Sequence, residues 1–143
     1  MDTVLHFQIH TINDIVGCGV CQKVQVTLGK NVQLHQKNKQ GIYTRHDGLQ
    51  YSHSQWTKDY GKSPYYIIWF DIYTSGWQIT PNDMAQREIK SNPVILQCPF
   101  DLPSEEWKYR DTETNKWIRA EENEINIACI ARGMIALLFL GPL

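Results

Sequence analysis

The sequence lacks the features that mark membrane-spanning, repeat and nucleic-acid-binding proteins. Its longest apolar stretch near the C-terminus covers only residues 134–140, whereas a spanning helix needs about 20 apolar residues. Internal repeats, low-complexity tracts and Asn-x-Ser/Thr glycosylation sites are also missing. The 14 basic residues nearly balance the 15 acidic ones, giving a net charge of −1, and a general nucleic-acid binder would carry a basic excess. We therefore predict no nucleic-acid partner and no membrane span.

Catalytic signatures are missing as well. The chain has no G-x-S-x-G elbow, no phosphate-binding loop, no dinucleotide fingerprint and no EF-hand loop. None of the five histidines has an acid or nucleophile at a diagnostic spacing. The pairs Glu105-Glu106 and Glu121-Glu122 are merely adjacent in sequence, whereas paired-carboxylate catalysis needs two groups at a defined separation in a cleft. We predict that the protein is not an enzyme and has no cofactor and no metal site.

What the sequence does have is an unusual number of aromatic residues, with five Trp and seven Tyr among 143 residues. A chain of this length fits a single domain. Gly and Pro divide it into short segments at a spacing of roughly 8–12 residues, which is typical of an all-β sandwich or barrel. We predict a mainly β fold, a small antiparallel sandwich or barrel of about 8–10 short strands with at most one short helix.

Alternation of polar and apolar residues places several strands. Residues 24–28 alternate as a half-buried strand does, and residues 65–73 are apolar on both faces, as in a central strand buried on both sides. Gly76 begins the strand that would complete the middle hairpin, and the Asp47-Gly48 pair is a hairpin-turn signal. The residues predicted to lead the core are Val24, Val26, Tyr43, Ile67, Trp69, Trp77 and Ile79.

One helix is predicted, over about residues 81–90. Thr80 would be its N-cap and Pro81 its first residue, and it would end before Asn92, because the residue before a proline avoids helical geometry. We divide the chain into an N-terminal extension (1–17), a single β domain (18–129) and an apolar C-terminal tail or closing strand (130–143).

The four cysteines raise a redox question. Cys18 and Cys21 have the C-x-x-C spacing of redox and zinc sites, but no helix follows to lower a thiol pKa, and Cys98 and Cys129 are too far apart to complete a typical zinc site. Disulfides fit better. Cys21 opens the first patterned strand and Cys129 closes the last, so we predict a bond between them, with Cys98 either paired with Cys18 or free.

Disulfides need an oxidising compartment, yet the first residues lack the basic region and continuous apolar region of a secretory signal. We therefore expect the chain to be part of a larger secreted protein or to be incomplete at its N-terminus, with an extracellular location.

Three aromatic residues are the candidate ligand-binding site. Trp107, Tyr109 and Trp117 lie on either side of the polar stretch 110–115, which we predict to be a hairpin turn. Across a paired ladder the three rings could meet on one face. Aromatic rings beside charged and amide groups are a typical means of holding sugars and peptides. The competing interpretation is that the rings only cap the core.

The order of these segments resembles an aromatic-rich β module of animal extracellular multidomain proteins, over about residues 18–129. The matching segments are Gly41-Ile42-Tyr43, Tyr65 to Trp69, Gly76 to Ile79, Cys98-Pro99 and Trp107-x-Tyr109. The resemblance implies a lectin-like adhesion or binding module for a glycan or protein ligand, without catalytic residues. As an alternative, Trp69 and Gly76-Trp77 resemble the WWE modules of intracellular ubiquitin and ADP-ribose signalling, which implies a cytoplasmic location and reduced cysteines.

Overall fold

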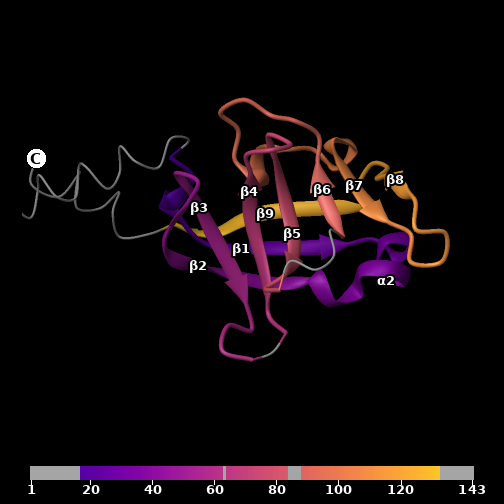
Figure 1. Cartoon of the computed structure of the whole chain (residues 1–143), viewed down its shortest axis with the longest axis horizontal. Coiled ribbons are helices and arrows are strands. Elements are labelled where there is room, and N and C mark those ends of the chain that lie inside the picture. The colour runs from indigo at the N-terminus through magenta and orange to yellow at the C-terminus, as the bar shows by residue number, and fades with distance from the viewer. Residues whose placement is uncertain (1–16, 63, 84–87, 133–143) are drawn as a thin grey trace, which may run out of the picture.

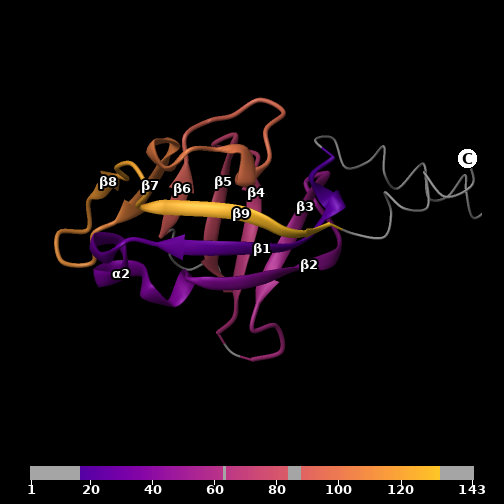
Figure 2. The same ribbon diagram turned by 180° about the vertical axis from the view of Figure 1, so that it is seen from behind.

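A computed structural model describes residues 17–62, 64–83 and 88–132. In this part of the chain nine strands form one antiparallel sheet that curls into a half-barrel, as predicted for the fold class (Figures 1 and 2). The strands are β1 (Cys21–Leu28), β2 (Gly41–Gln50), β3 (His53–Lys58), β4 (Tyr66–Asp71), β5 (Gly76–Pro81), β6 (Ile89–Ser91), β7 (Trp107–Arg110), β8 (Trp117–Arg119) and β9 (Ile125–Arg132).

Strands β1 to β8 follow one another as a meander, and β9 returns to pair with β1, so that β8 and β9 are the edges of the sheet. The curl brings the segment before β7 against the start of β9. The hydroxyl of Ser104 accepts hydrogen bonds from the backbone N–H groups of Glu124 (3.1 Å) and Ile125 (2.9 Å). These bonds hold the two ends of the sheet together at this side of the half-barrel.

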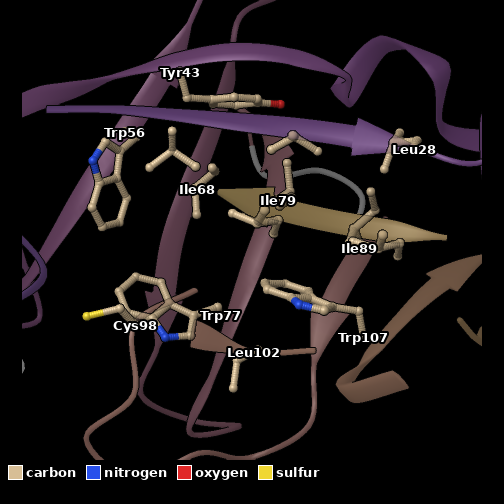
Figure 3. Close-up of a cluster of buried hydrophobic side chains, with 14 of the residues drawn as sticks. Leu28, Tyr43, Trp56, Ile68, Trp77, Ile79, Ile89, Cys98, Leu102 and Trp107 are labelled. Carbon is tan, nitrogen blue, oxygen red and sulfur yellow. The ribbon is translucent and has the colours of Figure 1, made fainter. Parts of the chain in front are cut away.

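Large side chains from the inner face fill the half-barrel (Figure 3). The polar ends of three buried rings find backbone acceptors, as buried Trp and Tyr generally require, whereas Trp107 Nε1 has no hydrogen-bond partner among the described residues. Trp56 Nε1 donates to the carbonyl of Cys21 (2.8 Å), Trp77 Nε1 to that of Gln97 (2.9 Å) and the Tyr43 hydroxyl to that of Lys39 (2.7 Å).

The predicted core is confirmed, because all seven of its members are buried. Two of them lie on the other side of the sheet from the main cluster. Ile68 pairs with Ile79 on the inner face, so Ile67 and Trp69 face outward from the same strand. There Trp69 Nε1 donates to the hydroxyl of Thr80 at 2.9 Å. Strand β4 is therefore buried on both sides, as its apolar sequence predicts.

The predicted helix over residues 81–90 is wrong in the part that the structure describes. Pro81 ends β5 as the pairing partner of Tyr66, and Ile89 begins β6; residues 84–87 lie outside the described residues. Within the described residues the α-helix is instead α2 (Lys30–Gln36), which buries Val32 and Gln36 on one face and is followed by one of four short 3₁₀ turns. These turns are η1 (Cys18–Val20), η2 (Lys37–Lys39), η3 (Pro99–Asp101) and η4 (Ser104–Glu106).

The β2–β3 hairpin turns later than predicted. Strand β2 continues past Gly48, and the turn consists of Tyr51 and Ser52, both with positive φ. Gly48 has a φ of 89° and lies where the register between β2 and β3 shifts. Its backbone freedom is thus used for a bulge within the strand rather than for the turn.

Two disulfides cross-link the sheet. Cys21 is bonded to Cys129, the pairing expected from the strand ends, and Cys18 is bonded to Cys98, with Cα–Cα distances of 5.8 and 5.6 Å. The first bond links β1 to β9, and the second links η1 to the loop before η3. The predicted extension and tail lie mostly outside the described residues, although β9 continues to residue 132.

Lys39 is a buried cation at the end of η2. Its side chain pairs with Glu88 and lies over the ring of Tyr66, with Nζ 5.3 Å from the ring centroid. Burial, and then repulsion from Lys58, lower the pKa of Lys39 from 10.5 to about 8. Burial of the nearby Tyr43 hydroxyl raises its pKa well above 10.0.

We expect stability to rise with pH between about 8 and 10. In this window Lys39 is still protonated in the unfolded state but is mostly deprotonated in the folded state. The unfolded state therefore binds more protons, and raising the pH favours the folded state. Above pH 10.0 the unfolded state begins to ionise Tyr43, which favours unfolding. Denaturant titrations across the window should show a flatter slope for Lys39→Met than for the wild type. The exposed control Lys62→Met should keep the wild-type slope; equal slopes in all three proteins would contradict the assignment to Lys39.

Candidate functional site

The three aromatic residues predicted to bind a ligand do not share one surface. Trp107 and Tyr109 are 0% and 5% exposed and belong to the core. Tyr109 pairs with Ile118, whereas Trp117 pairs with Arg110. Trp117 therefore projects from the outer face of the sheet, where it is partly exposed. This placement corrects the expectation of a three-ring surface, since only Trp117 offers part of its ring to the solvent.

Cations surround Trp117 on the outer face. Lys90 Nζ lies 4.1 Å from the centroid of the Trp117 ring, and Arg110 Cζ lies 5.2 Å from it. In the strand register, Lys90 pairs with Lys108 and Lys108 with Arg119. We call this region of β6, β7 and β8 the cationic surface; it consists of Lys90, Lys108, Arg110, Trp117 and Arg119.

Backbone and amide groups hold the arginines of the cationic surface in place. Arg110 Nη1 donates to Asn115 Oδ1 (3.1 Å), and Arg119 Nε donates to the carbonyl of Glu105 (3.0 Å). Among the residues that the structure describes, Lys108, Arg110 and Arg119 form no ion pair with a carboxylate. Arg119 shares a hollow with Glu105, Glu121 and Glu122, so Lys108 and Arg110 are the cations on which anion binding at this surface mainly depends.

A second surface feature lies on the outer face of β2 and β3. It is a hollow of about 540 Å³, which we call the β2–β3 hollow. Thr44 and Thr57 are register partners in its floor, and Tyr60 lies two residues after the end of β3. Its lining residues are Ile42, Thr44, Arg45, His46, Thr57, Asp59 and Tyr60.

Aromatic rings support one wall of this hollow. Tyr60 is 62% exposed, and its ring is braced from two sides. The ring of His46 lies 4.8 Å from it, centroid to centroid, and that of Tyr65 lies 5.0 Å away at an interplanar angle of 67°. Such contacts restrict the ring without covering it. Tyr60 thus presents an ordered aromatic surface to the solvent.

Polar groups of both charges border the hollow. Arg45 Nη1 donates to the carbonyl of Gly19 at 3.0 Å, so its guanidinium is fixed against η1. Asp59 has a φ of 61°, and its carbonyl accepts from the N–H of Lys62 (3.1 Å), which shapes the turn after β3. No ion pair engages the carboxylate of Asp59 within the described residues. It can therefore accept hydrogen bonds from a ligand.

Sequence reasoning missed this hollow because its residues come from a bulged strand and a turn. The Asp47-Gly48 signal places His46 in a turn, and Tyr60 follows a strand end. The alternation of Ile42, Thr44 and His46 is a signal for one exposed strand face, but it does not reveal that Tyr60 lies above that face.

Metal-binding clusters and membrane-spanning helices do not occur in the described ranges. These ranges contain no group of three or more His, Cys, Asp or Glu side chains placed to hold a metal ion. Nor do they contain a helix with the length and apolar character needed to cross a membrane. No known family model, curated protein or solved structure matches the chain. The resemblance to extracellular β modules accordingly stays a prediction.

Proposed function

We propose that this domain is a non-enzymatic, extracellular binding module that holds a sugar unit of a glycan in the β2–β3 hollow. The observation that carries the proposal is the exposed, braced ring of Tyr60 beside hydroxyl and carboxylate groups. A pyranose has an apolar C–H face that stacks on an aromatic ring and an edge of hydroxyls that need hydrogen-bond partners. The hollow offers both kinds of group at one place.

Size and chemistry support a small, uncharged ligand unit. The volume of about 540 Å³ falls within the ~300–1,000 Å³ range of small-molecule sites. The hydroxyls of Thr44 and Thr57 can donate or accept, and the carboxylate of Asp59 can accept two hydrogen bonds from neighbouring sugar hydroxyls. Hydrogen bonds to a charged acceptor are the stronger ones, so we assign Asp59 the role of orienting the sugar on Tyr60.

The disulfides support the extracellular location. Two bonds engage all four cysteines of the chain, and such bonds persist in oxidising compartments but are rare in the cytosol. The alternative, an intracellular WWE-like module, requires the same cysteines as thiols. An adhesion module outside the cell is therefore the proposal that agrees with the two disulfides.

We expect Tyr60→Ala to lower the affinity for a neutral oligosaccharide about tenfold or more, because it removes the stacking surface. An array of neutral glycans would identify the oligosaccharide, and calorimetric titration would measure its affinity. Tyr73→Ala is the matched control, since Tyr73 is 83% exposed in the β4–β5 turn, outside the hollow. Unchanged affinity in Tyr60→Ala, or an equal loss in Tyr73→Ala, would contradict the proposal.

A further inference from the structure

We propose a second ligand site, independent of the β2–β3 hollow: the cationic surface binds a sulfated polysaccharide. Four cationic side chains and Trp117 lie on the outer face of three neighbouring strands. The chain as a whole carries a net charge of −1. This local concentration of positive charge is thus a property of one face and not of the composition.

The spacing of the cations fits a linear polyanion. Lys90, Lys108 and Arg119 occupy one row across β6, β7 and β8, and neighbouring strands lie about 4.8 Å apart. Arg110 follows Lys108 two residues along β7, which is about 6.6 Å further along the strand. An extended anionic chain that crosses β7 and β8 would meet Lys108, Arg110 and Arg119 in succession without bending.

Trp117 orders part of this surface before a ligand binds. The ring attracts the ammonium of Lys90 at 4.1 Å and the guanidinium of Arg110 at 5.2 Å, and such cation–π contacts restrict long side chains that otherwise lose rotamer entropy on binding. The hydrogen bond from Arg110 to Asn115 adds a second restraint. The cations are therefore partly preorganised for an anion.

The form of the surface favours a polysaccharide over an acidic peptide. The cations project from the face of the sheet, so they offer side-chain charges, while the peptide groups of β6 and β7 are engaged in strand pairing. The sheet edge at β8 is only three residues long and offers a peptide little backbone pairing. A peptide usually gains affinity from backbone pairing at an edge or from a groove. Sulfate groups need neither, and arginine binds such oxyanions through two parallel N–H donors.

Affinity for heparin, the probe for this site, is the deciding measurement. Replacing Lys108 and Arg110 together by Ala should lower the affinity about tenfold or more at physiological salt. The slope of log affinity against log salt concentration should also fall, by roughly one for each cation that no longer pairs with a sulfate. The matched control is Lys30→Ala/Lys37→Ala, which removes two exposed lysines from the α2–η2 segment and changes the net charge equally. It should keep the wild-type affinity.

Further experiments test which type of ligand binds and whether each variant is folded. Desulfated heparin should bind at least tenfold more weakly than heparin, and a poly-glutamate peptide or single-stranded DNA should not compete at equal charge concentration. Equal binding of any of these probes, or an equal loss in the Lys30→Ala/Lys37→Ala control, would overturn the proposal. Melting curves verify that each variant folds. Tyr60→Ala should bind heparin normally, so failure of the sugar site and failure of this site are separable.

Discussion

Replacing both Cys21 and Cys129 by Ala is expected to destabilise the domain by about 4–5 kcal/mol in the chain-entropy description of a cross-linked unfolded state. The bond joins residues 108 apart in sequence, and loss of so long a closed loop releases the most entropy to the unfolded chain. It also leaves the β1–β9 pairing, which brings together segments far apart in sequence, held by strand contacts alone. Domains of this size have only about 5–15 kcal/mol of stability.

Denaturant unfolding under non-reducing conditions measures this loss. Alkylation of the folded wild type without reductant should first leave all four cysteines unmodified, because they are in disulfides. The Cys18→Ala/Cys98→Ala variant is the matched comparison. The bond that it lacks closes a loop of 80 residues, compared with 108 for the Cys21–Cys129 bond. Because the chain entropy depends on the logarithm of loop length, the two variants should lose the same stability within about 0.5 kcal/mol. A Cys21→Ala/Cys129→Ala variant with wild-type stability would contradict the claim that the bond between these residues stabilises the domain.

Trp77→Ala is expected to cost about 3–5 kcal/mol, the range for deleting a large ring from a packed core. Trp77 is fully buried, and its ring meets those of Phe70 and Trp56 at centroid distances of 5.4 and 5.9 Å. Its loss would leave a cavity that these rigid rings cannot fill, and would leave the Gln97 carbonyl without its indole donor.

Thermal or denaturant unfolding of Trp77→Ala can be compared with that of Trp117→Ala. Both changes remove an indole, but the Trp117 side chain is partly exposed on the outer face, so its loss should cost less, roughly 1 kcal/mol. If the two variants were equally stable, the assignment of Trp77 to the inner face and Trp117 to the outer face would be incorrect.

The sheet was predictable where burial on both faces is encoded in a single segment. The β4 sequence is apolar at successive positions, so its burial could be predicted without knowing which face of the strand points inward. Its hairpin with β5 followed from Gly76. The helix was missed because α2 buries only Val32 and Gln36, and two buried side chains in seven residues give no clear period of 3.6. The Thr80-Pro81 pair imitated a helix start, but tertiary pairing with Tyr66 placed Pro81 at a strand end.

The candidate sites were harder to predict, because they depend on register. Alternation alone puts Trp107 and Tyr109 on one face, but it does not say whether that face points inward. The structure pairs Tyr109 with Ile118, and a shift of one residue in a ladder moves a side chain to the opposite face. Trp117 is therefore separated from the other two rings. Arg110 lies in the same hairpin as Trp117, but Lys90 comes from β6, and local sequence patterns do not bring it beside the Trp117 ring.

The most direct measurement of the proposed function is a backbone-amide chemical-shift titration with the neutral oligosaccharide that the array identifies. Sugar binding in the β2–β3 hollow predicts saturable shifts at Thr44, His46, Thr57 and Tyr60, and none of comparable size at Lys108 or Trp117 on the cationic surface. Absence of saturable shifts with any neutral glycan, or shifts centred away from the hollow, would contradict the assignment of this domain as a sugar-binding module.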